Sequence, residues 1–134
     1  MTKVVIDTNI LVSSLLSPYG APGRIVDMML TGNLTVCYDS RILSEYSEVL
    51  ERPKFGFNKR DVKLLIDFIA SSGISVIPAP LSVELLDEDD RAFLEVAKHC
   101  DAFLITGNKK HYPDEEKTVT VTQFLDIQQL PNVL

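Results

Sequence analysis

The sequence predicts an α/β fold in which a mainly parallel sheet is covered by helices on both faces. Short runs of β-branched and other apolar residues alternate along the chain with segments whose apolar residues recur at helical spacing. The alternation of strands and helices along the chain favours a mainly parallel sheet with helices on both faces.

The first strand is predicted at KVVID, residues 3–7, which polar residues end. NILVSSLLS follows as a short helix that Pro18 stops. APGRIVDMMLTGN predicts a second helix, because Pro22 suits a first turn and Gly32 suits a C-terminal stop.

LTVCY, residues 34–38, is the second predicted strand, and Asp39 or Ser40 can cap a helix that runs to about Leu50. After a loop with Pro and Gly, residues 59–72 place apolar side chains at helical spacing. The remaining elements are a strand at 74–78, a helix at about 90–99, strands at 102–106 and 118–121, and a final helix that begins near Thr122.

The composition indicates one ordinary globular domain over residues 1–134. The chain is 46% hydrophobic and 24% charged, and it shows no repeat, low-complexity segment or linker. The two cysteines are far apart and lie in apolar stretches, so we expect buried free thiols and a reducing cytoplasm. We predict no signal segment, and no apolar run approaches the roughly 20 residues that span a membrane.

The net charge of −6 argues mildly against a nucleic-acid-binding protein. However, five of the acids fall in the window Glu84–Asp90, while basic residues gather at 52–63 and again at Lys109, Lys110 and His111. A protein that meets nucleic acid through a metal carries its acids in the site and its bases on the rim. The alternative is that both runs are solvated surface.

Polar residues follow two strands that we expect to be parallel neighbours. Asp7 ends the first strand, and Asn108 follows AFLIT in the turn Thr106-Gly107-Asn108. Ligands of open parallel sheets gather at the carboxyl ends of the strands, so these side chains could converge.

Two further acids belong to helices. Glu45 falls at the edge of the apolar stripe of its helix, whereas Glu48 points away from that stripe; Glu45 could also be a boundary residue that extends into solvent. Asp90 lies one turn before Phe93, on the predicted buried face. It could bind a metal, or it could simply cap the helix N-terminus and interact with the helix dipole. Asp89 is the alternative metal ligand if Asp90 is not one.

Carboxylates that converge from distant segments suit a hard cation such as Mg²⁺ or Mn²⁺. Such an ion lowers the pKa of a bound water, which can then attack phosphorus, so phosphodiester hydrolysis is the expected chemistry. Asp7 would anchor the ion, Asp90 would share it, and Glu45 would ligate it or orient the water. Asn108 would add a neutral oxygen or a hydrogen bond. The candidates for support of these ligands are Thr8, Asn9 and Thr106.

Four segments together resemble the PIN-domain family. VVIDTNILVS resembles its opening motif, SRILSEYSEVLERPKF the stretch with the second acid, DDRAFLEVA the third motif, and DAFLITGNKKHYP the fourth. In the third motif the family aspartate precedes a small residue by seven positions, and Ala97 therefore selects Asp90. The resemblance is greatest to PIN toxins of bacterial toxin–antitoxin pairs.

The resemblance implies a three-layer αβα fold, divalent-metal dependence, cleavage of single-stranded RNA, frequent homodimers and a cognate antitoxin that blocks the site. The chain departs from the family where Asn108 replaces a frequent aspartate, which puts a second metal in doubt. Lys109, Lys110 and His111 could instead meet RNA phosphates, although a lone histidine is more often a surface residue.

Other functions are compatible with parts of this pattern. A PIN fold that has lost catalysis and binds RNA or protein agrees with Asn108 and with the acidic net charge. A phosphatase of the haloacid-dehalogenase type also has an aspartate after its first strand, but it needs Asp-x-Asp where this chain has Asn9. A phosphoacceptor receiver domain would need an acidic pair before the end of the first strand, and this pair is absent.

Overall fold

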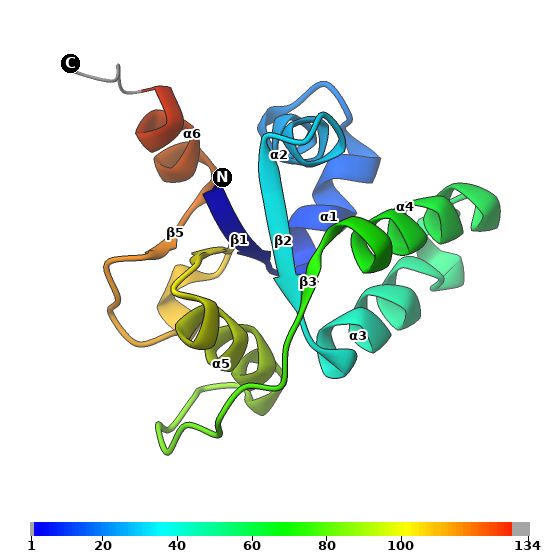
Figure 1. Cartoon of the computed structure of the whole chain (residues 1–134). Coiled ribbons are helices and arrows are strands. Elements are labelled where there is room, and N and C mark those ends of the chain that lie inside the picture. Colours follow the sequence, from blue (N-terminus) through cyan, green and yellow to red (C-terminus); the bar gives the residue numbers. More distant parts are fainter. Residues whose placement is uncertain (1, 130–134) are drawn as a thin grey trace.

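Five parallel strands form the centre of the molecule in a computed structural model that describes residues 2–129 (Figure 1). The strand order is β3-β2-β1-β4-β5, and all neighbouring strands are parallel. The strands are β1 Thr2–Ile6, β2 Leu34–Tyr38, β3 Ile74–Ser75, β4 Phe103–Ile105 and β5 Thr118–Val119. The predicted α/β fold with a parallel sheet is therefore confirmed.

Helices cover both faces of this sheet. They are α1 Thr8–Leu16, α2 Ala21–Leu30, α3 Ser40–Leu50, α4 Lys59–Ser72, α5 Arg91–Cys100 and α6 Val121–Gln129, and the 3₁₀ turns are η1 Pro53–Phe55, η2 Glu88–Asp90 and η3 Lys109–His111. Helix α5 packs on β1, β2 and β4, while α2 packs on β2, α1 and α6. Figure 1 shows α5 and the α1–α2 pair on opposite sides of β1 and β2. Helices α3 and α4 pack on each other beside β2.

Local signals set the helix ends much as expected. The Asp39 carboxylate caps α3 by accepting a hydrogen bond from the backbone N–H of Ile42 at 3.0 Å. Asn58 caps α4 in the same way. Gly32 has a φ of 83°, the left-handed conformation that glycine allows after a helix C-terminus.

The predicted elements near the third strand and the C-terminus need correction. The strand expected at 74–78 ends at Ser75, because only one more ladder bond forms, from Val76 N–H to the Tyr38 carbonyl at 3.0 Å, and Pro78 has no N–H to donate. The strands expected at 102–106 and 118–121 are shorter than predicted, and α6 begins at Val121.

The two cysteines are neighbours in space although they are far apart in sequence. Both are free; Cys37 is fully buried, whereas Cys100 is only half-buried. Burial, and then the adjacent Cys100 thiol, raise the pKa of Cys37 to about 12, so it stays a neutral thiol at neutral pH. Within residues 2–129, the helices are too short or too polar to cross a membrane.

The register of β1 and β4 brings their carboxyl ends side by side. Ile6 pairs with Ile105, and the next N–H along, that of Asp7, donates to the Ile105 carbonyl at 2.9 Å. Asp7 and Thr106 therefore leave the sheet together at one edge, where side chains from different strands can meet.

Candidate active site

Asp7 is a buried carboxylate held from the neighbouring strand end. Its side chain is only 5% exposed, and its Oδ2 accepts hydrogen bonds from Thr106 Oγ1 at 2.8 Å and from the Tyr112 hydroxyl at 3.2 Å. Burial raises the pKa of Asp7, and the bonds from Thr106 and Tyr112 oppose this rise. The carboxylate is thus fixed in orientation but costly to ionise.

Glu45 reaches this edge from α3. Its Oε2 accepts a hydrogen bond from Thr8 Oγ1, and Thr8 is the buried first residue of α1, directly after Asp7. Burial raises the pKa of Glu45, the Thr8 bond lowers it, and the charges of Asp7, Asp89 and Asp90 raise it further. Glu48, one turn on, is an exposed partner of Arg52, as its place on the helix predicts.

Asp90 enters from the start of α5. Its Oδ2 is buried and has no hydrogen-bond partner among residues 2–129, although His111 Nδ1 lies at ion-pair distance, 3.3 Å away. Burial raises the pKa of Asp90, as do the charges of Asp7 and Asp87, while the nearby His111 lowers it. A buried carboxylate oxygen without a donor is energetically unfavourable unless a cation or water meets it.

The three carboxylates act on one another electrostatically. The charges of Asp7 and Asp90 raise the pKa of Glu45, and the charge of Asp7 raises that of Asp90. The fold therefore gathers three acids separated by tens of residues in the chain. Their mutual repulsion is the condition that a divalent cation relieves.

The expected supporting residues differ in where their side chains lie. Thr8 and Thr106 are buried and hydrogen-bonded to Glu45 and Asp7 respectively, as support of these acids requires. Asn9 is exposed, and its side chain makes no hydrogen bond with any other residue in 2–129. Asn108 is also exposed and joins the network through its backbone, since its N–H donates to Thr106 Oγ1 at 3.0 Å.

The basic segment after β4 divides between two environments. His111 turns toward Asp90, Lys109 Nζ contacts Gln123 Oε1 of α6 at 3.4 Å, and Lys110 is exposed. These three residues thus have different surroundings, and their contact with RNA phosphates stays a prediction.

Two features of the site were missed at the level of sequence. Tyr112 is buried against Asp7, and contact with Asp7 and Asp90 adds to burial in raising its pKa. Glu95 is buried on α5 and accepts from Arg41 Nη1 at 2.9 Å and from the Leu81 N–H at 2.8 Å. Tyr112 follows a polar turn and Glu95 lies on a helix among apolar residues, and neither position marks a functional residue. Only their hydrogen bonds in the structure connect them with the site.

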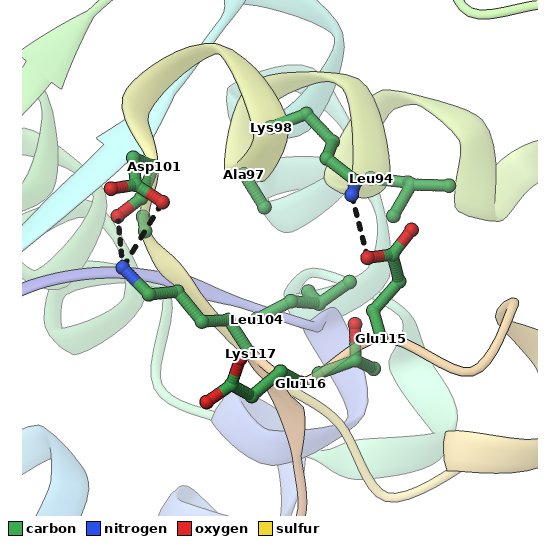
Figure 2. Close-up of a pocket in the computed structure, with 10 residues that line it drawn as sticks. Leu94, Ala97, Lys98, Asp101, Leu104, Glu115, Glu116 and Lys117 are labelled. Atoms are coloured by element: carbon green, nitrogen blue, oxygen red, sulfur yellow. Dashed lines mark hydrogen bonds and ion pairs between the residues drawn. The ribbon is translucent and has the colours of Figure 1, made fainter.

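One cavity lies beside the site carboxylates, and another lies elsewhere on the molecule. A cleft of about 250 Å³ runs beside Glu45 and Asp89, with Arg41 and Arg91 on its walls. Figure 2 shows a separate pocket of about 220 Å³ between α5 and the segment before β5. Lys98 pairs with Glu115 and Lys117 with Asp101 in this pocket, which borders the start of β4, away from Asp7.

The residues present fit a divalent cation with few protein ligands. No three His, Cys, Asp or Glu side chains within residues 2–129 are grouped closely enough to hold one ion as they stand. The unpartnered Asp90 Oδ2 and the buried Asp7 carboxylate nevertheless supply hard oxygen donors, and Mg²⁺ commonly takes one or two carboxylates with water for the rest.

The fold and the site define a three-layer α/β protein with buried acids at the carboxyl edge of its sheet. A sequence profile of the family described as PIN domain matches residues 3–110. The chain therefore belongs to the PIN-domain family, whose members are generally nucleases.

Two relatives support this assignment. An uncharacterized protein of Methanocaldococcus jannaschii is 37% identical over 113 residues, which cover 80% of this chain and 71% of that protein. A chain in the crystal structure of VapBC2 from Rickettsia felis, bound to a DNA fragment from the promoter, superposes with a TM-score of 0.54 at 15% identity. That match covers 81% of this chain and 90% of the other, and it supports the fold.

Proposed function

We propose that this protein is a divalent-metal-dependent endoribonuclease that hydrolyses phosphodiester bonds of single-stranded RNA. The observation that carries the proposal is the convergence of Asp7, Glu45 and Asp90, from three separate elements, into one partly buried acidic site. PIN-family membership supplies the nuclease chemistry, and the raised pKa values of the acids supply the reason to bind a cation.

Each acid has a distinct role in the proposal. Asp7 and Asp90 would hold Mg²⁺ or Mn²⁺, which supplies a more acidic water and stabilises the leaving oxygen. Glu45, anchored by Thr8, would orient the attacking water through its second carboxylate oxygen, for which residues 2–129 supply no hydrogen-bond donor. Asn108 would contact substrate as a neutral group, and exposed Lys110 would meet backbone phosphate.

A partner protein also belongs to the proposal. The solved neighbour is a complex named VapBC2 bound to promoter DNA, and we propose that this chain is likewise the toxin of a toxin–antitoxin pair and forms a homodimer. The antitoxin would then cover the acidic site. A non-catalytic module that binds RNA or protein is the second candidate, because no closely grouped set of three ligands exists in the described residues.

Cleavage of a pool of single-stranded RNAs tests the catalytic proposal. The wild-type protein should cut with Mn²⁺ or Mg²⁺ and not with chelator. Asp90→Asn and Glu45→Gln should each lose at least about 100-fold in rate, given that residues merely supporting a metal ligand are worth roughly 10–100-fold. Glu48→Gln is the matched control on α3, and it should cleave like wild type because Glu48 is exposed.

Two results would contradict the catalytic proposal. Cutting that persists in chelator would exclude metal dependence, and wild-type rates in Asp90→Asn would remove that residue from the site. A wild-type protein that binds RNA without cutting it under any of these conditions would favour the non-catalytic module.

A further inference from the structure

We infer that Tyr112 is a positioning residue whose hydroxyl, together with that of Thr106, holds Oδ2 of Asp7 and thereby fixes the rotamer in which this carboxylate would meet the cation. This inference rests on the proposed function and names a residue outside the predicted site. It starts from the way in which hydrogen-bond donors are distributed over the two oxygens of Asp7.

Both side-chain donors of Asp7 meet the same oxygen. Thr106 Oγ1 donates to Oδ2 at 2.8 Å, and the Tyr112 hydroxyl donates to Oδ2 at 3.2 Å. No side chain in residues 2–129 donates to Oδ1, although the backbone N–H groups of Thr8 and Asn9 also stabilise this carboxylate. Because two donors from different directions meet Oδ2, rotation of the carboxylate would break both bonds, and Oδ1 keeps one orientation.

The turn after β4 delivers Tyr112 to this position. Thr106 Oγ1 donates to Asp7 and accepts from the Asn108 N–H, which fixes the start of the turn. The turn η3 then closes through His111 N–H to the Asn108 carbonyl at 2.9 Å and Tyr112 N–H to the Lys109 carbonyl at 3.2 Å. Tyr112 is consequently 6% exposed, with its hydroxyl directed into the acidic site.

The chemistry of the hydroxyl agrees with this role. A phenol donates a hydrogen bond to a carboxylate and carries no charge of its own, so it orients Asp7 without adding positive charge that would repel a cation. The adjacent His111 behaves differently, because its ring nitrogen lies 3.3 Å from Asp90 Oδ2 and would add positive charge when protonated. Tyr112 therefore supports the ligand, whereas His111 would have to move if Oδ2 of Asp90 bound the ion.

The test is the affinity for Mn²⁺, measured by calorimetry on the full chain without RNA. Tyr112→Phe keeps the buried ring and removes only the hydroxyl. The dissociation constant should rise about 10-fold or more, as for other residues that orient metal ligands. Tyr38→Phe is the matched control: it also removes a buried hydroxyl bond, to the Ala70 carbonyl at 2.7 Å, and it should bind Mn²⁺ like wild type.

A second measurement keeps the inference testable if Tyr112→Phe fails to fold. With 3-fluorotyrosine at position 112, the fluorine resonance should shift when Mg²⁺ is added. Three results would overturn the inference. They are an unchanged Mn²⁺ affinity in folded Tyr112→Phe, an equal loss of affinity in Tyr38→Phe, and a fluorine resonance that does not shift when Mg²⁺ is added. If wild type itself binds no Mn²⁺, the proposed function fails and the inference fails with it. If wild type and Tyr112→Phe bind Mn²⁺ equally well, the inference fails and the proposed function stands.

Discussion

Asp7, Glu45 and Asp90 are each less acidic than ordinary carboxyl groups, with burial as the largest cause. A carboxyl whose pKa is higher in the folded than in the unfolded chain binds its proton more tightly when folded. Its contribution to stability therefore falls as pH rises from the ordinary aspartate value of 3.8 through the raised folded pKa. At neutral pH, without metal, the site acids destabilise the fold.

We therefore expect Asp90→Asn to raise the melting temperature of the metal-free protein at pH 7 by about 3 °C, which corresponds to a gain of somewhat under 1 kcal/mol. The gain should vanish below about pH 4, where the wild-type carboxyl is also protonated. Circular dichroism melts in chelator measure both values, and Mn²⁺ should then stabilise wild type more than the variant. Glu48→Gln is again the control, and a variant less stable than wild type at pH 7 would contradict the account.

Site residues can be predicted from the sequence when they directly follow a recognisable strand. The strand ends predict that Asp7 and Asn108 approach each other. In the structure Thr106 joins them, because its Oγ1 donates to Asp7 and accepts from the Asn108 N–H, while Asn108 itself is exposed. Tyr112 could not be found in this way. Its contact with Asp7 depends on the path of the turn η3, which no periodicity encodes.

An ion-pair network with two buried carboxylates and a half-exposed arginine joins α3, which carries Glu45, to α5, which begins directly after Asp90. Arg41, at the start of α3, pairs with Asp39 at 2.7 Å and with Glu95 of α5 at 2.9 Å. Glu95 is almost fully buried and also accepts from the Leu81 N–H, so it ties the segment before α5 to the same network. The network thereby fixes α3 and α5 relative to each other.

Arg41→Met should destabilise the protein by about 2 kcal/mol. Loss of one partner of a fully buried pair costs roughly 3–5 kcal/mol, and the value is reduced here because Arg41 is 48% exposed. Arg52→Met breaks an exposed pair with Glu48 and should cost less than about 0.5 kcal/mol. Urea unfolding measures the free energy of unfolding of both variants. Equal losses would show that the ion-pair network of Arg41 contributes nothing beyond an ordinary surface pair.

Element types were predictable from the sequence far better than strand lengths. The helix over 59–72 agrees with α4, because its apolar spacing and the Asn58 cap are local signals. The strand predicted over 74–78 from the run ISVIP is longer than the observed β3. This segment lies at the edge of the sheet, where pairing on one side ends after Val76 and Ile77 is exposed.

At the scale of the whole molecule, parallel topology brings the acids to one edge. β1 and β4 are adjacent although about a hundred residues separate Asp7 from Thr106. The segment after β3 leads the chain to Asp90, and α5, which begins at Arg91, then packs on β1, β2 and β4. The edge of the sheet that carries the acids could be predicted from the direction of the strands. The distances between the acids could not, because they depend on the packing of α3 and α5.

The position of a bound cation tests the central proposal most directly. Crystals of the wild-type protein grown with Mn²⁺ should show anomalous scattering at the manganese absorption edge, with a peak in contact with Asp7 and Asp90. Asp90→Asn crystals under the same conditions should lose or weaken that peak. A peak elsewhere, or none at an Mn²⁺ concentration that supports RNA cleavage, would contradict the assignment of this acidic edge as the metal site.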